Sequence, residues 1–217
     1  MTFATRDQNT ARKVASLLLE IQAVKLNLQH PFIWASGWKS PIYCDNRKSL
    51  GYPKIRTFIK NSLAERIQLK FPDCQAIAGV ATAGIPQGAL VADILNLPFL
   101  YVRSKPKGHG LENLIEGHYQ SNQRVVLVED LISTGGSSLR AVEALRNVDV
   151  EVLGLASIFN YGFDIAIKNF EDANVPWFSL SNYQHLIDYA AETGIVTRTQ
   201  LETLEAWRKQ PSAWSAG

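Results

Sequence analysis

The chain has 217 residues and a formal net charge of +2, and 46% of its residues are hydrophobic, as in a folded globular protein. So small a charge provides no basic excess of the kind that marks a nucleic-acid or membrane-binding surface, and we expect neither partner. Cys44 and Cys74 lack metal-ligand spacing and are too few for a disulfide framework. A chain of this length suits one domain, and we expect it to extend over residues 1–217. The sequence shows no charged-then-apolar leader and no long apolar span, so we expect a cytoplasmic protein.

The first predicted element is an amphipathic helix over residues 10–24. Its apolar positions recur at helical spacing and would face the core: Val14, Leu17, Leu18 and Ile21. Lys25 follows this helix. Residues 30–47 are then rich in aromatic side chains, turn formers and cations without a helical period, so we expect short strands joined by a Ser-Gly turn. Trp34 and Trp38 in this segment suit either core packing or a binding site.

The next predicted elements alternate between helix and strand. Pro53 suits the first turn of a helix that extends to about residue 68. The stripe that this helix would bury consists of Ile55, Phe58, Ile59, Leu63 and Ile67. The short apolar run at residues 75–81 predicts a strand, and a loop at residues 82–88 leads into another helix. Residues 99–102 predict a further strand.

A basic segment follows at residues 103–117. Three glycines and a proline exclude regular structure from most of it, and its cations and histidine are Arg103, Lys105, Lys107 and His109. One interpretation is a mobile surface loop with solvated charges. Because the segment connects two strands of the same predicted sheet, we favour a lid that folds over a bound anion, neutralises its charge and excludes water.

The segment at residues 124–138 contains the strongest functional pattern. Residues 125–128 are Val-Val-Leu-Val, a run typical of a strand buried on both faces. Glu129 and Asp130 would close that strand, and a Thr-Gly-Gly-Ser turn follows. The apolar positions of the next helix are Leu139, Val142 and Leu145. The expected unit is a strand, a loop and a helix, with the loop at the sheet edge where open α/β sheets bind ligands.

The two acids and the glycine-rich turn together indicate a particular ligand. Carboxylates accept hydrogen bonds from vicinal hydroxyls, and glycine lets the backbone amides at a helix N-terminus approach a phosphate. A ribose 5-phosphate has both groups. The turn has neither the Gly-Lys-Ser/Thr of a Walker loop nor the Gly-x-Gly-x-x-Gly of a dinucleotide fold. The alternative is an ordinary strand-to-helix connection with two solvated acids.

The C-terminal part of the chain is predicted to serve mainly packing. Residues 151–158 suit a buried strand. Residues 181–184 and 199–202 have the form of capping boxes that begin two helices, and Gly194 would end the first. Three histidines lack the neighbours of a metal site or a catalytic triad and are expected to be structural: His30, His118 and His185.

The central segment resembles the type I phosphoribosyltransferases, whose signature is an apolar strand, two acids and a Thr-Gly-rich phosphate loop. Ser-Gly-x-Lys-Ser-Pro-x-Tyr at residues 36–43 and Arg-x-x-x-Lys-x-His-Gly at residues 103–110 are similar to segments of the orotate phosphoribosyltransferase branch. The resemblance covers about residues 14–163. It implies transfer of the phosphoribosyl group from phosphoribosyl pyrophosphate to orotate, with Mg²⁺, giving orotidine 5′-monophosphate and pyrophosphate in pyrimidine (UMP) biosynthesis.

The resemblance also implies roles for individual residues. The catalytic residues would be Lys107, Arg103, His109 and Asp130, and Ser133 would contact orotate. We add Lys25 as a candidate orotate contact, which the resemblance itself does not supply. The phosphoribosyl pyrophosphate site would comprise Arg103, Lys107, His109, Glu129, Asp130, Leu131, Ile132, Ser133, Thr134, Gly135, Gly136 and Ser137. The loop at residues 82–88 would lie beside the pyrophosphate. Mg²⁺ would be held through this substrate and water, with no direct ligand from the protein.

The chain departs from the family pattern at several positions. Some members have a lysine where this chain has Ala83, and some have a lysine in place of Ser104, so those contacts with phosphoribosyl pyrophosphate stay open. Lys105 could make the contact that those members make with the lysine at the position of Ser104. Better-known members also have an arginine linked to the orotate carboxylate, but none occurs near Asn160. The remaining candidates for that carboxylate are backbone amides, Lys25 and Arg47.

The expected fold is an α/β domain with a mainly parallel sheet flanked by helices and a small hood from both termini. The hood would comprise about residues 1–50 and the C-terminal part, and the core about residues 51–180. In the family the basic loop reaches the neighbouring subunit, which implies a homodimer with shared active sites. Two alternatives remain: a purine phosphoribosyltransferase, which does not need the segments at residues 36–43 and 103–110, and a non-catalytic relative that senses phosphoribosyl pyrophosphate and needs a basic surface.

Overall fold

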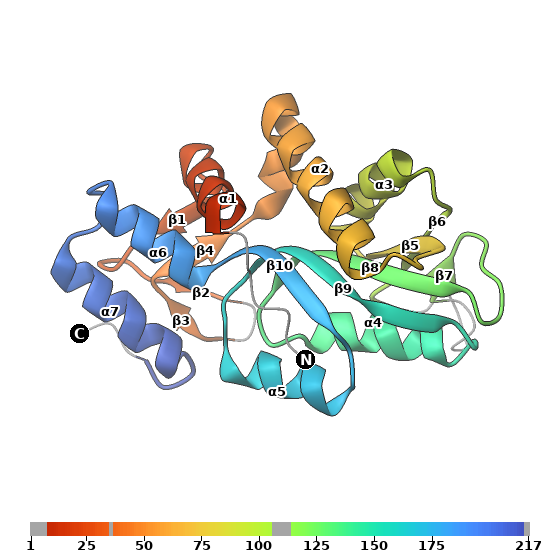
Figure 1. Ribbon diagram of the computed structural model, residues 1–217. Helices are drawn as coiled ribbons and strands as arrows, with labels where there is room; N and C mark the ends of the chain where they lie inside the picture. Colours follow the sequence, from red (N-terminus) through yellow and green to blue (C-terminus); the bar gives the residue numbers. More distant parts are fainter. Residues whose placement is uncertain (1–7, 35–36, 106–113, 215–217) are drawn as a thin grey trace.

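The computed structural model describes residues 8–34, 37–105 and 114–214 (Figure 1). A six-stranded sheet forms its centre, with the strand order β10-β9-β8-β5-β6-β7. The strands are β5 (Ala76–Val80), β6 (Phe99–Val102), β7 (Ile115–Glu116), β8 (Arg124–Ile132), β9 (Glu151–Asn160) and β10 (Trp177–Asn182). Neighbouring strands pair in parallel except β6 and β7, which are antiparallel. The predicted mainly parallel sheet is therefore confirmed.

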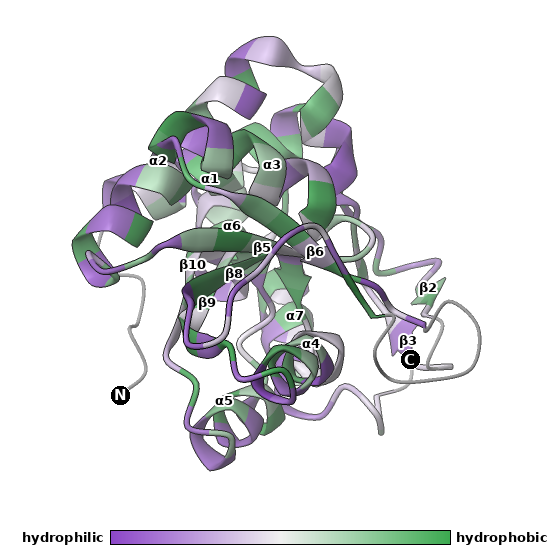
Figure 2. Cartoon of the chain, turned by 90° about the vertical axis from the view of Figure 1, so that its right-hand side faces the viewer, coloured by the Kyte–Doolittle hydropathy of each residue, from purple (hydrophilic) through white to green (hydrophobic). Residues whose placement is uncertain are grey.

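Helices cover both faces of this sheet. On one face lie α1 (Gln8–Glu20), α2 (Pro53–Lys70) and α3 (Gly84–Leu95), and on the other α4 (Gly136–Arg146) and α5 (Asp164–Asp172) (Figure 1). The middle of β8 needs no alternation of polar and apolar residues, because Val125 and the three residues after it are each 0% exposed. Figure 2 shows the same layering, with hydrophobic strands inside and hydrophilic segments on α2 and α5. In the described part of the chain, no helix is both long enough and apolar enough to cross a membrane.

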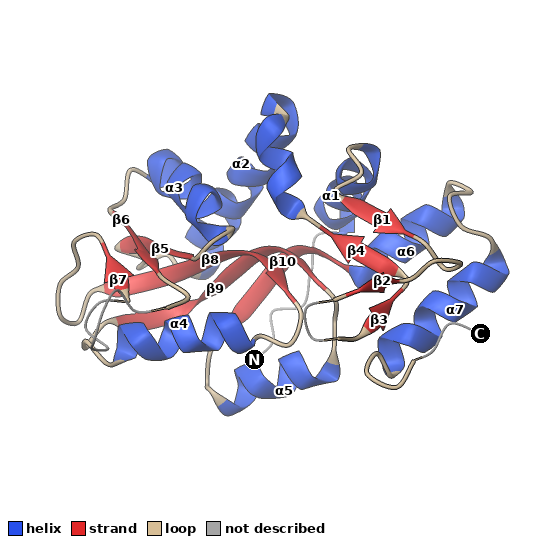
Figure 3. Ribbon diagram, turned by 180° about the vertical axis from the view of Figure 1, so that it is seen from behind, coloured by secondary structure: helices blue, strands red, loops and turns tan. Residues whose placement is uncertain are grey.

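A smaller unit packs beside the sheet. Its N-terminal part has two antiparallel pairs, β1 (Val24–Leu26) with β4 (Ile42–Cys44) and β2 (Phe32–Ile33) with β3 (Lys39–Ser40), followed by the short helix η1 (Asn46–Gly51). From the C-terminal side, α6 (Tyr183–Glu192) packs against α1 and α7 (Arg198–Lys209), and Trp207 of α7 is hydrogen-bonded to Lys39 of β3 (Figure 3). We call residues 24–44 together with α7 the hood. The predicted hood from both ends of the chain is confirmed.

Aromatic rings join the two parts of the hood to the sheet. The Trp34 ring centroid lies 5.6 Å from that of Trp207 in α7 and 4.9 Å from that of Tyr161, which follows β9. Trp207 is 0% exposed, and its indole Nε1–H donates to the Lys39 carbonyl at 3.1 Å. Ring packing therefore holds the N-terminal hairpins to the C-terminal helix, and it does so without a shared strand.

Two predicted boundaries in the N-terminal helix and the central strand were wrong. β8 continues through Glu129 and Asp130 to Ile132, because β9 is also long and pairs Asn160 with Ile132. The acids therefore lie within the strand and do not close it as predicted. α1 ends at Glu20, earlier than predicted, and the chain turns into β1.

The two predicted capping boxes were displaced along the chain. Asn182 caps α6, and its side-chain oxygen accepts from the His185 N–H at 3.0 Å. The Ser181 hydroxyl is buried and donates to a carbonyl of α1 instead. α7 has a reciprocal capping box between Thr197 and Gln200, at an earlier position than the predicted one. Tertiary contacts and competing local caps decided both helix starts.

Replacement of Trp207 should test how much the hood depends on the C-terminal helix. Trp207→Ala removes a fully buried ring and should lower the free energy of unfolding by about 3–5 kcal/mol. Trp207→Phe keeps a ring but loses the bond to Lys39, at a cost of about 1 kcal/mol beyond the lost contacts. Urea unfolding gives both values. Leu69→Ala, at a side chain that is 75% exposed, is the control, and equal stability of Trp207→Ala and Leu69→Ala would contradict this role.

Candidate functional site

The candidate site lies where the strand order of the sheet reverses. β5 and β8 are hydrogen-bonded neighbours, yet the chain passes from β5 to β6 on one side and from β8 to β9 on the other. The loops that follow these two strands therefore diverge at their carboxyl ends. Open α/β sheets bind ligands in the crevice between such loops, here between residues 81–83 and 133–135.

Glu129 and Asp130 stand beside this crevice near the end of β8. Glu129 is 5% exposed, and its Oε1 accepts a hydrogen bond from the Asp130 N–H at 3.0 Å. Burial, and after it the charge of Asp130, raises the pKa of Glu129 well above its usual range. Burial also raises the pKa of Asp130, against the lowering effects of a hydrogen bond from Glu129 and of the Arg47 guanidinium. Full ionisation of the pair is therefore disfavoured until a ligand supplies hydroxyl donors or positive charge.

The loop between β8 and α4 is fixed in a form that suits an anion. Gly135 has a φ of +81°, and a Cβ on it would lie 2.8 Å from the Phe170 ring, so only glycine fits there. The Thr134 carbonyl accepts from Asn169 Nδ2 at 2.9 Å, which fastens the loop to α5. α4 begins at Gly136 with no acidic residue in its first turn. Its unpaired amides and the positive end of its dipole are therefore available to a phosphate.

The loop after β5 is pressed against β8. A Cβ on Gly84, the first residue of α3, would collide with the Val128 carbonyl oxygen and lie 3.2 Å from Glu129 Cα. The start of α3 therefore lies directly beside Glu129 of β8. The helix begins already at Gly84, so the predicted loop at residues 82–88 is shorter than expected, and Ala83 brings only backbone groups to it.

A cavity of about 390 Å³ adjoins the phosphate loop. Its lining includes Trp34, Trp38 and Tyr43 from the hood and Ser133, Thr134 and Tyr161 from the sheet. Among the described residues, none that lines it carries a charge. Aromatic walls with a few hydroxyl groups suit a flat ring with polar edges. Both interpretations of the two tryptophans are therefore combined: they pack in the hood and also line a cavity.

Asn46 ties the hood to the acid pair, and no sequence pattern predicted this role. This side chain is 0% exposed, and its Nδ2 donates to the Asp130 carbonyl at 2.7 Å. The Cys44 thiol, which also lines the cavity, donates to Asn46 Oδ1 at 3.2 Å. Asp45 and Arg47 flank Asn46, so a solvated turn is the natural expectation for this stretch. Only the tertiary structure shows that its middle residue is buried.

The two cations considered for a ligand carboxylate lie near the cavity but do not line it. Lys25 in β1 pairs with Tyr43 in β4, so both side chains are on the same face of that strand pair. Lys25 is exposed. Arg47 is also exposed, and its Nε lies 2.6 Å from Asp45 Oδ1. The guanidinium of Arg47 is close enough to Asp130 to act on the pKa of that acid.

The basic segment is described only at its ends. Arg103 follows β6, and its Nη1 lies 3.1 Å from Glu116 Oε1 of β7. Lys105 is exposed. Lys107 and His109, the other predicted site residues of this segment, lie outside the described residues. The structure therefore brings together the acids, the phosphate loop and Ser133, and places Arg103 at the start of the segment.

Comparisons with known proteins identify relatives of this chain. The phosphoribosyl transferase domain model matches residues 48–188. Orotate phosphoribosyltransferase from Porphyromonas gingivalis is 56% identical over 201 residues, which cover 93% of this chain and 96% of that protein. Orotate phosphoribosyltransferase from Bacteroides fragilis is 54% identical over 210 residues, which cover 97% and 99%. The crystal structure of orotate phosphoribosyltransferase from Aeropyrum pernix superposes with a TM-score of 0.74 at 28% identity, over 85% of this chain and 99% of that one.

The buried acid pair should lower the free energy of unfolding as the pH rises. Because burial raises the pKa of Glu129, the folded chain holds its proton more tightly than the unfolded chain does. The free energy of unfolding therefore decreases as the pH rises from the unfolded pKa, about 4.3, through the folded pKa. Glu129→Gln should remove that decrease. The free energy of unfolding of Glu129→Gln, relative to that of the original chain, should therefore increase between pH 5 and pH 8. The increase should be about 1.4 kcal/mol for each pH unit over which Glu129 is ionised in the unfolded chain but protonated in the folded one.

Thermal and urea unfolding without substrates, at several pH values, measures this difference. Glu143→Gln is the matched control, because Glu143 is exposed on α4, and its difference from the original chain should not change with pH. A Glu129→Gln difference that is just as flat would show that Glu129 ionises freely in the folded protein.

Proposed function

Because the chain belongs to the phosphoribosyl transferase family and, within it, to the orotate phosphoribosyltransferases, we propose a specific division of its site residues among the parts of the reaction. The reaction transfers the phosphoribosyl group from phosphoribosyl pyrophosphate to orotate and serves pyrimidine biosynthesis. One observation carries the assignment: an uncharged aromatic cavity of about 390 Å³ opens beside the acid pair and the phosphate loop. A purine phosphoribosyltransferase and a non-catalytic sensor are not favoured, because the relatives at 54% and 56% identity are named for orotate.

The chemistry decides which groups matter. Orotate is an anion and needs little activation as a nucleophile. A ring nitrogen loses its proton and forms a bond to the anomeric carbon of the ribose, while the bond from that carbon to a pyrophosphate oxygen breaks. The leaving oxygen takes the electron pair of the broken bond, and the proton passes to the pyrophosphate or to solvent. Positive charge therefore grows on the ribose and negative charge on the pyrophosphate, and groups that stabilise these charges in the transition state raise the rate.

Orotate would occupy the aromatic cavity. Its flat ring would lie between the hood rings and Tyr161, and the Ser133 hydroxyl would bond to a polar edge of the ring. Lys25 would meet the carboxylate from the face that carries Tyr43. In this arrangement the hood supplies shape and the exposed lysine supplies charge.

The ribose and its 5-phosphate would bind along the segment from Glu129 to Ser137. Glu129 and Asp130 would accept hydrogen bonds from the ribose hydroxyls, and their charge would stabilise the cationic ribose of the transition state. The backbone of Leu131 and Ile132 continues β8 to the loop, where Thr134 and the three residues after it would hold the phosphate through amides and hydroxyls. The hydroxyls and charge brought by the ligand would offset the cost of the buried acid pair.

The pyrophosphate would be bound between the loop after β5 and the basic segment. Arg103 would exchange its bond with Glu116 for the pyrophosphate, with Lys107 and His109 approaching from the same segment. Cations that meet the growing negative charge lower the barrier more than they strengthen ground-state binding. Lys107, Arg103, His109 and Asp130 would therefore be the catalytic residues.

Mg²⁺ is the proposed cofactor. Among the described residues, no group of three or more His, Cys, Asp or Glu is placed to hold a metal ion. Glu129 and Asp130 are adjacent carboxylates whose ionisation a nearby cation would favour. Two nearby acids without a full set of ligands suit an ion that keeps several waters and is held through substrate phosphates, as Mg²⁺ is. When bound, it would neutralise part of the pyrophosphate charge.

We further propose a cytoplasmic homodimer with shared sites, because a loop as long as the one from Arg103 to Leu114 has the reach to enter a neighbouring subunit. The hood and the sheet would act as one catalytic domain, since the cavity has walls from both.

Base selectivity tests the proposed function. The protein should consume phosphoribosyl pyrophosphate when orotate and Mg²⁺ are present. The loss of orotate absorbance in the ultraviolet measures this reaction. Uracil lacks the carboxylate that Lys25 would meet, and loss of one charged contact of about 1.5–3 kcal/mol should lower kcat/KM roughly 10- to 150-fold. Adenine, guanine and hypoxanthine should give no pyrophosphate. Faster turnover with any purine base would move the chain to the purine branch.

Mixed dimers test the shared site. Lys107→Ala should lower kcat far more than it raises KM, since its charge is needed most as pyrophosphate leaves. Asp130→Asn should weaken the use of phosphoribosyl pyrophosphate by about 1.5–3 kcal/mol.

If Lys107 acts in the neighbouring subunit, a heterodimer of the two variants has one site with both changes and one with neither, and recovers about half of normal activity. Verified heterodimers without recovery would place Lys107 in its own subunit's site.

A further inference from the structure

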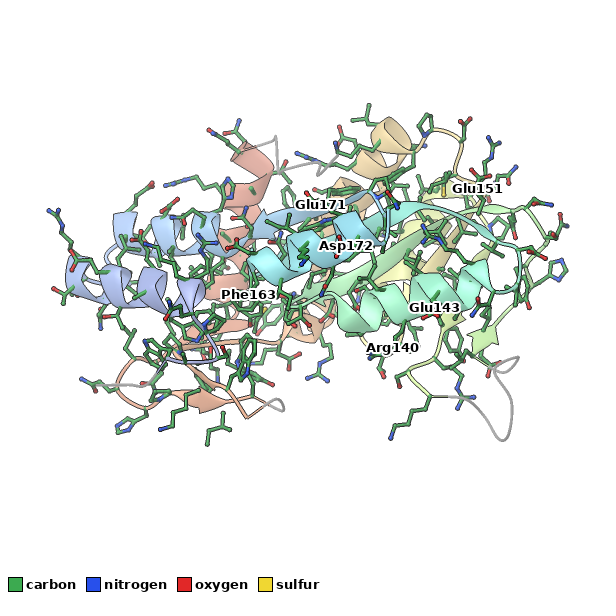
Figure 4. The ribbon with its side chains drawn as sticks, turned by 90° about the horizontal axis from the view of Figure 1, so that it is seen from below. Arg140, Glu143, Glu151, Phe163, Glu171 and Asp172 are labelled. Atoms are coloured by element: carbon green, nitrogen blue, oxygen red, sulfur yellow. The ribbon has the colours of Figure 1, made fainter. Side chains whose placement is uncertain are left out.

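Arg140 lies one helical turn after Gly136 on α4, beside the phosphate loop (Figure 4). Long side chains on a helix lean back toward its N-terminus and cover the residue four positions earlier. The structure shows this arrangement directly, because a Cβ on Gly136 would lie 3.6 Å from Arg140 Nη1. The same point lies 3.8 Å from Thr134 Oγ1. A guanidinium and a hydroxyl therefore converge on the first turn of α4.

The guanidinium of Arg140 has no structural use in the described part of the chain. It makes no hydrogen bond or ion pair with any residue described there, and the side chain is exposed. Arg146, on the same helix, is different: its guanidinium donates to the Ala173 and Asn174 carbonyls at 2.9 and 3.4 Å. α4 therefore carries one arginine that fastens it to α5 and another that is left uncommitted at the opposite end.

The position of Arg140 is unfavourable unless an anion binds there. The N-terminus of a helix carries partial positive charge, so a cation beside it is repelled, and no acidic residue in the first turn of α4 compensates. An anion held by the amides of the first turn would reverse the sign of this interaction. Arginine is also the side chain best suited to phosphate, because its planar guanidinium donates two parallel hydrogen bonds.

We propose that Arg140 completes the phosphate loop as a binding residue for the 5-phosphate of phosphoribosyl pyrophosphate. This inference rests on the proposed function and adds a side-chain cation to a site that otherwise consists of amides and hydroxyls. The same contact would hold the 5′-phosphate of the product. It would leave the pyrophosphate and the base untouched, because those groups bind at the loop after β5 and in the hood cavity.

Binding of ribose 5-phosphate, which has the 5-phosphate but no pyrophosphate, isolates this contact. Its Kd is measured by calorimetry and by competition with phosphoribosyl pyrophosphate for the original chain, Arg140→Gln, Arg140→Lys and Lys168→Gln. Arg140→Gln should weaken ribose 5-phosphate binding roughly 10- to 100-fold, as expected for loss of a charged hydrogen bond to phosphate. It should also raise KM for phosphoribosyl pyrophosphate, while KM for orotate and inhibition by pyrophosphate stay within about twofold. Arg140→Lys, which keeps the charge, should recover part of the loss.

Lys168→Gln is the matched control, because it removes the same charge from an exposed position on the neighbouring helix α5. Its Kd for ribose 5-phosphate should stay within about twofold of the original. An equal effect of both glutamine variants would reduce the contact to long-range attraction and overturn the proposal, as would an unchanged Kd in Arg140→Gln. If the original chain itself did not bind ribose 5-phosphate in competition with phosphoribosyl pyrophosphate, the proposed function and the role of Arg140 would both fail.

Discussion

The burial of two adjacent carboxylates in β8 is the constraint on which the site depends. β9 extends alongside the end of β8, and α3 begins so close to it that Gly84 admits no side chain. Glu129 is thereby removed from water with only the Asp130 N–H as a hydrogen-bond donor among the described residues. A folded chain tolerates such a pair at some cost in stability, and the proposed ligand would offset that cost with its hydroxyl groups and its developing positive charge. The strand is thus built for the complex more than for the free protein.

The second requirement is that both ends of the chain meet at this strand. Trp34 from the first hairpins packs against Trp207 from the last helix, and Asn46 bonds the same N-terminal region to the Asp130 carbonyl at 2.7 Å. The cavity beside the phosphate loop exists because of these contacts, since its walls come from the hood and from the end of the sheet. One buried asparagine and a cluster of rings would therefore align the base with the ribose in the complex that we propose. A parallel sheet alone would provide only the phosphate loops.

Local sequence patterns predicted the parts that depend on local physics. The run at residues 125–128, the acids and the glycine-rich turn are contiguous, so the strand, the loop and the start of α4 follow from spacing alone. Three features that these patterns missed depend on partners distant in sequence. β8 extends past Glu129 because β9 pairs with it, Ser181 leaves its cap to bond α1, and Asn46 is buried between two charged neighbours. No window of the sequence contains those partners.

Better-known family members bind the orotate carboxylate with an arginine that this chain lacks near Asn160. Which cation replaces it depends on which one can move without losing another contact. Arg47 is paired with Asp45, and its charge lowers the pKa of Asp130, so its transfer to a ligand would remove a counter-charge from the buried acids. The side chain of Lys25 makes no hydrogen bond or ion pair within the described residues, and Lys25 lies opposite Tyr43 in the strand register. A lysine acts as a mobile point charge and needs no fixed geometry. Its engagement would leave the acid pair undisturbed, and for that reason we propose Lys25 rather than Arg47 as the partner for the carboxylate.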